Sequence, residues 1–167
     1  DSYTLVLTAQ PLQPVTLSLT PDSQSTLTAA SLLFTAGNWN VAQSVTVTAF
    51  DDSFAEGLHA SLITHATTCA DANFNALAVS SVTANITDND FADILLAETN
   101  ADTTCGEQGF ADVFSLVLTS QPLANVSITI SPDSQLATSV SSVTFTPGNW
   151  DQVVYVSVLV RLTPLRG

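Results

Sequence analysis

Carboxylates concentrated in two stretches are the residues best suited to chemistry in this sequence. The first stretch holds Asp51, Asp52 and Glu56. The second runs over residues 88–112 and holds seven acids, namely Asp88, Asp90, Asp93, Glu98, Asp102, Glu107 and Asp112. Neither stretch contains a Lys or Arg, so like charges oppose compaction there. Ca²⁺ takes about six to eight oxygen ligands and would remove this repulsion. The alternative is a solvated acidic surface that keeps the protein soluble.

Groups that could act in catalysis are present but follow no known catalytic pattern. The sequence has no nucleophile elbow, no glycine-rich phosphate loop and no lysine. His59 and His65 lie in one predicted strand, roughly 20 Å apart, and therefore cannot share a metal ion. We interpret both histidines as structural, and we expect the protein not to be an enzyme.

The overall charge excludes several classes of partner. The 167 residues contain 15 Asp and Glu against 2 Lys and Arg, which gives a formal net charge of -13. A nucleic-acid backbone or an anionic membrane would be repelled. No apolar run approaches the length of a transmembrane helix, so we expect no membrane insertion. The hydrophobic share of 46% argues against disorder.

An internal repeat organises the chain. Residues 1–50 align without gaps to residues 112–161, an offset of 111, with 21 of the 50 positions identical. The longest identical blocks are 5–8 with 116–119, 10–12 with 121–123, 21–24 with 132–135 and 37–39 with 148–150. A period of this length is a whole domain, so the sequence predicts two copies of one module.

The repeat also sets the expected domain boundaries. We place one domain at residues 1–90, lacking its first strand, and a second at 91–167, lacking its last strands. The chain therefore reads as an excerpt of a longer array. Residues 161–167 depart from the repeat: both arginines of the chain lie there, and Arg161 replaces the expected Phe. We interpret this segment as a foreign tail, which arises from a wrong reading frame, an alternative splice end or an added segment. Simple drift of a terminal repeat is the alternative.

Apolar residues recur with a period of two, which predicts strands with one buried face. Residues 15–20, 44–48 and 125–130 show the alternation most clearly. Turn residues separate about seven such strands per unit, which predicts antiparallel β-sandwiches of immunoglobulin-like shape. We interpret Trp39 and Trp150, each just after a Gly-Asn turn, as lids on the core; stacking on a sugar is the alternative.

Several motifs together resemble the Calx-beta family. They are Asp-Asp-Ser-Phe-Ala-Glu-Gly at 51–57, Asp-Asn-Asp at 88–90, and Glu98 with Gly-Glu-Gln-Gly at 106–109 ahead of a predicted strand. The resemblance implies a seven-stranded sandwich that in several members binds Ca²⁺ at one tip. The implied ligands are Asp51, Asp52, Glu56, Asp88 and Asp90 in the first unit and Glu98 in the second. Neither unit holds the complete family ligand set, and many repeats of this kind serve only as spacers.

The two cysteines leave three possibilities open. Cys69 and Cys105 are each half of a disulfide whose partner lies outside this chain, or they bridge to each other, or both are free thiols. Either disulfide would indicate an oxidising, extracellular compartment. Two N-glycosylation sequons, at Asn85 and Asn125, favour the same compartment, and both asparagines fall on the polar phase of their strands.

These observations predict an extracellular structural or adhesive repeat module of a large cell-surface or filament-forming protein, with Ca²⁺ rigidifying the acidic loops. Its expected partners are neighbouring repeats, other copies in a filament, or cell-surface glycans. The alternatives are a regulatory Ca²⁺-sensing domain and a carbohydrate-binding module that uses Trp39 or Trp150.

Overall fold

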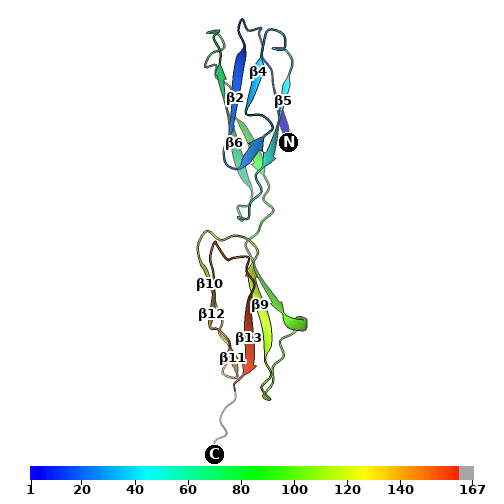
Figure 1. The fold of residues 1–167 in the computed structure, drawn as a ribbon, viewed down its shortest axis with the longest axis vertical. Coiled ribbons are helices and arrows are strands. Elements are labelled where there is room, and N and C mark those ends of the chain that lie inside the picture. Colours follow the sequence, from blue (N-terminus) through cyan, green and yellow to red (C-terminus); the bar gives the residue numbers. More distant parts are fainter. Residues whose placement is uncertain (162–167) are drawn as a thin grey trace, which may run out of the picture. The chain divides into compact units, whose positions relative to one another are not determined.

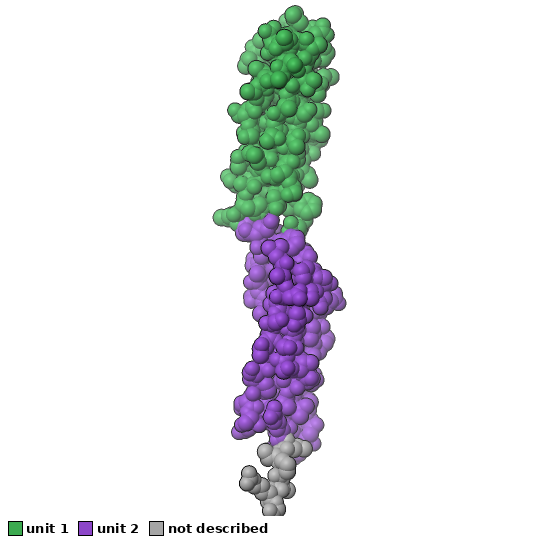
Figure 2. All heavy atoms as spheres, turned by 90° about the vertical axis from the view of Figure 1, so that its left-hand side faces the viewer, with its two compact units in different colours: residues 1–52, 58–88 green, residues 53–57, 89–167 purple. Residues whose placement is uncertain are grey.

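Antiparallel strands make up the regular structure of this protein. The computed structural model describes residues 1–161, and its helical content there is a single 3₁₀ turn, η1 (Thr99–Ala101). The chain forms two compact units (Figure 2). Unit 1 comprises residues 1–52 and 58–88, and unit 2 comprises residues 53–57 and the chain from Asn89 onward.

Unit 1 contains two antiparallel sheets (Figure 1). Its strands are β1 (Ser2–Leu5), β2 (Val15–Pro21), β3 (Ser25–Leu27), β4 (Ser31–Phe34), β5 (Gln43–Ala49), β6 (His59–Thr68) and β7 (Val82–Ile86). One sheet has the order β1-β5-β3 and the other has the order β4-β2-β6-β7. Strand β2 therefore lies between two neighbours, β4 and β6.

The core of unit 1 lies between these sheets. Val15, Leu17 and Leu19 alternate along β2 and are buried, because successive side chains of a strand point to opposite faces. Phe34 from β4 and Val45 from β5 complete the same cluster, so apolar residues of both sheets pack together. This is the arrangement of a β-sandwich.

Unit 2 repeats this plan with a different set of strands. They are β8 (Ile94–Glu98), β9 (Asp112–Leu118), β10 (Val126–Thr129), β11 (Leu136–Thr138), β12 (Ser142–Phe145) and β13 (Val154–Val160). The sheets have the orders β11-β13-β9-β8 and β10-β12. Leu116, Val143, Phe145 and Val156 form the centre of the core between them.

The sequence repeat is also a structural repeat. Strands β3, β4 and β5 begin 111 residues before β11, β12 and β13, and each pair has equal length. The pairing is kept as well: β1 pairs with β5 as β9 pairs with β13, and β2 with β4 as β10 with β12. Two elements lack a counterpart among the described residues. Strand β8 has none in unit 1, and the β6–β7 hairpin has none in unit 2.

The identical Gly-Asn-Trp blocks form the same turn in both units. The Asn38 side-chain oxygen accepts hydrogen bonds from the Thr35 backbone N–H at 2.5 Å and from the Thr35 hydroxyl at 2.9 Å. Asn149 accepts the same two bonds from Thr146, at 2.6 and 2.9 Å. A short polar side chain that satisfies nearby backbone groups is the physical reason for Asn at this position.

Residues 53–57 group with unit 2, although they connect β5 to β6. Within that unit the Gln121 backbone N–H donates to the Ser53 carbonyl oxygen at 2.7 Å. The expected first domain, 1–90, included this segment. The interpretation of residues 161–167 as a foreign tail concerns mostly residues outside those that the structure describes.

Candidate functional site

The six acids implied as Ca²⁺ ligands divide between the two units. Unit 1 contains Asp51, which is exposed, and Asp52 and Asp88, which are half-buried. Unit 2 contains the other three, of which Glu56 and Glu98 are exposed and Asp90 is half-buried. Each unit therefore holds half of the implied set.

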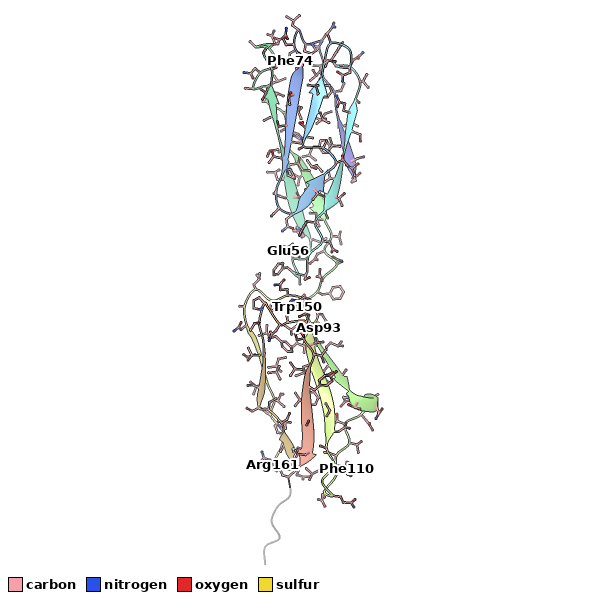
Figure 3. All side chains as sticks on the ribbon, viewed as in Figure 1. Glu56, Phe74, Asp93, Phe110, Trp150 and Arg161 are labelled. Carbon is pink, nitrogen blue, oxygen red and sulfur yellow. The ribbon has the colours of Figure 1, made fainter. Side chains whose placement is uncertain are left out.

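Glu98 lies far from the start of its own strand. It ends β8, opposite Phe114 of β9, whereas Asp93 precedes Ile94, which lies opposite Leu118. At about 3.3 Å per residue, Asp93 and Glu98 are roughly 16 Å apart along the strand. The Glu98 carboxylate accepts a hydrogen bond from the Thr103 hydroxyl at 2.9 Å. Figure 3 shows Asp93 at the end of unit 2 that also carries Trp150.

Metal-ligating side chains do not cluster in the part of the chain that the structure describes. Among residues 1–161, no three His, Cys, Asp or Glu side chains come together in an arrangement that could hold a metal ion. The residues present therefore do not fit a site that a single unit closes with protein carboxylates. Ca²⁺ sites with few charged ligands bind weakly.

One carboxylate with three hydrogen bonds, two of them to β6, is one that the sequence analysis did not select. Asp22, just after β2, accepts hydrogen bonds from the Leu62 backbone N–H and the Ser61 hydroxyl, both at 2.7 Å, and from the Gln24 backbone N–H at 3.0 Å. These bonds favour the charged form, so the Leu62 N–H first and the Ser61 hydroxyl second lower the pKa of Asp22. The Ser61 hydroxyl also lies 2.7 Å from that of Ser25, and both serines are buried. Asp22 thus ties the β2–β3 corner to β6. The Pro-Asp-Ser-Gln block, which recurs at residues 21–24 and 132–135, was the sequence feature from which a role for Asp22 could have been predicted.

Two further aspartates stabilise loops. Asp112 accepts from the backbone N–H groups of Thr104 and Val113, both at 2.7 Å, and the Thr104 bond is the main reason that its pKa is lowered. Asp71 accepts from the N–H of Asn73 at 3.0 Å and of Leu12 at 3.2 Å, which lower its pKa in that order. Both carboxylates therefore have structural hydrogen-bonding roles.

The tryptophans are half-buried in both units. Trp150 packs against the core of unit 2, as a lid would. Their backbone carbonyls have equivalent roles: Trp39 accepts from the Leu7 N–H at 3.0 Å, and Trp150 from the Leu118 N–H at 3.2 Å. This environment favours the lid over a sugar-stacking platform.

Cys69 and Cys105 are both half-buried, and the bridge between them is not formed. Pairing of each with a cysteine outside this chain stays a prediction. Cys69 packs against the core of unit 1, and its sulfur accepts a hydrogen bond from the Asp71 N–H at 3.2 Å. Asn85 and Asn125 are both exposed, as the polar phase of their strands predicted.

The histidines lie at separate positions on β6. The His65 Nδ1 lies 2.8 Å from the Ser80 carbonyl oxygen, which can only accept, so Nδ1 carries a proton. On its other side, Nε2 lies 3.0 Å from the Tyr3 hydroxyl. His59 is half-buried. His65 thus connects β6 to β1, which is a structural role.

Two small hollows lie in unit 1. One, of about 170 Å³, is lined mainly by apolar residues from the end of β1 and the residues after it and from the segment after β6, including Leu5, Phe74 and Leu77. The other, of about 190 Å³, lies beside Ser25, Val47 and Ala84. Pockets for drug-sized ligands measure roughly 300–1,000 Å³, so neither hollow would bury such a ligand.

Comparison with protein-family models, with curated proteins and with solved structures finds no match. Across residues 1–161, none of the helical structure is long and apolar enough to cross a membrane.

Proposed function

We propose that this protein is a structural or adhesive repeat module that works outside the cell, as part of a cell-surface or filament-forming protein. The observation that carries the proposal is the duplication itself. Five strands recur at an offset of 111 residues, together with the Gly-Asn-Trp turn in which Asn38 or Asn149 accepts a backbone hydrogen bond. Repeated modules extend a chain and present the same surface several times, whereas an active site needs to be built only once. The Calx-beta resemblance supports the same role, because many such repeats are spacers.

The extracellular part of the proposal rests on the sequons. Asn85 lies on β7, the last strand in the order β4-β2-β6-β7, and its side chain is exposed. Asn125 immediately precedes β10 and is also exposed. A glycan attached at either position would extend into solvent without disturbing the core.

Calcium is proposed in addition, from charge alone. Ten of the 15 acids lie in the two acidic stretches, and the two basic residues, Arg161 and Arg166, lie in neither. Divalent cations would reduce the resulting repulsion. Because three protein ligands do not gather among the described residues, we expect weak binding, with dissociation constants on the order of 10⁻⁴–10⁻³ M as in other extracellular modules. The proposed partners are neighbouring repeats, further copies of the protein or cell-surface glycans.

The experiment that tests the location is secretion from eukaryotic cells. We expect the secreted chain to lose mass on treatment with an N-glycosidase, and the Asn85→Gln/Asn125→Gln double variant to show no such loss. Asn100→Gln is the matched control, because Asn100 is exposed but belongs to no sequon. A secreted chain without glycan at either asparagine would remove the main support for the extracellular location.

The adhesive part needs a separate measurement. Beads coated with the folded chain are expected to aggregate in millimolar Ca²⁺ and to disperse when Ca²⁺ is chelated. Beads coated with heat-unfolded chain control for non-specific association. Coated beads that stay dispersed in both conditions would restrict the proposal to a spacer.

A further inference from the structure

Apolar side chains lie on the solvent side of one sheet of unit 2, the sheet β11-β13-β9-β8. Val156 of β13 is fully buried in the core, so the positions that alternate with it point outward. Three of these positions hold Val153, Tyr155 and Leu159, which are 48, 70 and 41% exposed. On β8, Leu95 is 57% exposed.

Strand pairing makes these outward residues neighbours. Tyr155 lies opposite Ser115 of β9, and Ala97 of β8 lies opposite the same serine. Leu95 lies opposite Val117 of β9. Residues opposite one another on a sheet have Cβ atoms about 4.5–5.5 Å apart. The outward side chains therefore form one surface across β13 and β9, which Figure 1 shows side by side, and β8. We call this surface the outer face, and its larger apolar members are Leu95, Val113, Val117, Val153, Tyr155 and Leu159.

The outer face carries no charge, although the chain contains 15 acids. Its side chains come from residues 95–97, 113–117, 137 and 153–159, and none of these residues is charged. A chain with a net charge of -13 repels further copies of itself. At the outer face two copies can meet without bringing carboxylates together and without removing carboxylates from water.

Unit 1 shows that the fold does not require this composition. At the offset of 111, Ser44 and Thr48 of β5 correspond to Tyr155 and Leu159 of β13, and both are exposed. The buried residue that follows Ser44 or Tyr155 is valine in both units. The same strand therefore folds with outward hydroxyls in one unit and with outward apolar side chains in the other. Apolar side chains that the core does not use, gathered on one face, indicate a binding surface.

The exposed area corresponds to a weak pairing. Aromatic side chains bury roughly 150–250 Å² each when they are covered. At the exposures given above, Leu95, Val153, Tyr155 and Leu159 together offer on the order of 400 Å². Two such faces in contact would remove about 800 Å² from water, and the surrounding residues would add to it. Stable interfaces bury roughly 1,200–2,000 Å² in total, and transient ones lie below that range.

We propose that the outer face of unit 2 is the surface through which two copies of this chain pair, sheet against sheet. The two sheets then pack about 10 Å apart, as the sheets of a β-sandwich do. A two-fold axis through the face gives each copy the same contacts, so each apolar surface covers the other. The inference assigns a surface to the association of copies, and it rests on that part of the proposed function alone.

A second copy suits this face better than a sugar does. Specific recognition of a sugar requires several directed hydrogen bonds. Apart from the Tyr155 hydroxyl, the polar side chains of the outer face are Ser115 and Ser157. The Ser115 hydroxyl already donates to the Ala97 carbonyl oxygen at 3.4 Å. The apolar surface of another copy needs no such partners.

Sedimentation equilibrium of the whole chain tests the pairing. A reductant prevents cross-links through the cysteines, and about 0.5 M salt screens the repulsion between copies. We expect a reversible monomer–dimer equilibrium at protein concentrations of about 0.1–1 mM, as the small area indicates. A chain that stays monomeric throughout this range would overturn the proposal.

A double variant tests whether the outer face is the surface involved. Tyr155→Ser/Leu159→Thr introduces the residues that unit 1 has at the equivalent positions, so the fold should be kept, which circular dichroism checks. We expect the dissociation constant of the dimer to rise by roughly tenfold or more. The matched control is Leu12→Ser/Leu123→Ser, because these leucines are 83 and 88% exposed and lie in loops outside the outer face. Equal weakening by the two double variants would show non-specific association and overturn the proposal.

Dilution of the original chain maps the contact without any substitution. Amide chemical shifts should change with concentration at residues 95–97, 113–117 and 153–159, and should stay constant at residues 42–48 of unit 1. Changes confined to other segments would overturn the assignment. A monomeric chain whose outer-face amides shift instead on addition of an oligosaccharide would assign the face to sugars and would also overturn it.

The bead assay separates this inference from the proposed adhesive function. If beads coated with Tyr155→Ser/Leu159→Thr aggregate in Ca²⁺ as well as beads coated with the original chain, adhesion stands but does not use the outer face. If the original chain forms the expected dimer while its beads stay dispersed, the pairing stands and the adhesive function fails.

Discussion

Tyr3 and His65 join the two sheets of unit 1 through one hydrogen bond. The Tyr3 hydroxyl on β1 lies 3.0 Å from Nε2 of His65 on β6, and the two rings meet edge to face with centroids 5.7 Å apart. Because Nδ1 donates to the Ser80 carbonyl, Nε2 of that neutral tautomer accepts a hydrogen bond from the Tyr3 hydroxyl. Phe114 occupies the equivalent position in unit 2 and has no hydroxyl. This link is therefore specific to the unit that contains β6.

Removing the Tyr3 hydroxyl should destabilise unit 1. Tyr3→Phe keeps the ring but deletes the bond to His65, and a hydrogen bond of this kind contributes about 1 kcal/mol. We expect a loss of that size in the free energy of unfolding, measured by urea denaturation. Tyr155→Phe is the matched control, because Tyr155 is 70% exposed and its replacement should cost almost nothing. Equal losses in the two variants would contradict the role given to Tyr3.

Burial also affects how Tyr3 titrates. Desolvation raises the pKa of Tyr3 above its ordinary value, because the charged phenolate loses hydration in the folded protein. A raised folded-state pKa means that this contribution to stability is complete below the unfolded pKa and is lost as the pH rises through the folded pKa. In the Tyr155→Phe chain, tyrosinate absorbance should therefore appear at a higher pH than in the same chain unfolded in urea. Coincident titration curves would contradict this prediction.

Asp22 should contribute to stability toward acid. Its pKa is lowered in the fold, first by the Leu62 N–H, so the contribution is present above the unfolded pKa and is lost as the pH falls through the folded pKa. Asp22→Asn should lower the melting temperature near neutral pH and flatten its fall toward low pH. Asp133→Asn is the matched control: Asp133 accepts from Gln135 and Leu136 within its own turn, whereas Asp22 also binds β6. If both variants give the same melting curves, the β6 contact is not the source of the effect.

The two cores should respond separately to truncation. Phe34 and Phe145 are equivalent, and both are fully buried. Phe34→Ala and Phe145→Ala should each cost about 3–5 kcal/mol, from lost burial and from the cavity left behind. We expect hydrogen exchange to accelerate mainly in the unit that carries the substitution. Acceleration spread evenly over both units by either variant would show that they unfold as one.

Removal of calcium is the prediction that tests the acidic stretches. We expect a chelator to lower the melting temperature, because the folded chain then loses the free energy of ion binding to its carboxylates. An ion at about 100 times its dissociation constant contributes about 2.7 kcal/mol. Asp51→Asn/Asp52→Asn should reproduce the effect of the chelator and make the chain insensitive to it. An unchanged melting temperature at constant ionic strength would leave the acids as a solvated surface.

Local patterns were sufficient to predict the antiparallel β-structure. Alternation at residues 15–20, 44–48 and 125–130 lies on β2, β5 and β10, because a strand with one buried face imposes that period on its own sequence. The offset of 111 predicted that the Gly-Asn-Trp blocks would form equivalent turns. Both features depend on residues close together in the chain or on identity between the copies.

Long-range partners could not be predicted in the same way. Asp22 and Leu62 are 40 residues apart, and nothing in the spacing indicates that one will bind the N–H of the other. Asp51 belongs to unit 1 and Glu56 to unit 2, because residues 53–57 pack with unit 2. The Asp-Asp-Ser-Phe-Ala-Glu-Gly motif does not specify this packing. Clustering of acids in the sequence likewise did not bring three of them together within the described residues.

The Thr35–Asn38 and Thr146–Asn149 turns use only amide and hydroxyl groups. Neither salinity nor acidity alters the charge of these groups, so both corners should keep the same geometry in fresh water, in brine or at low pH. The corner at Asp22 depends instead on an ionised carboxylate. A drop in pH should therefore loosen the β2–β3 corner and the loop that Asp71 holds, while the Gly-Asn-Trp corners keep their geometry.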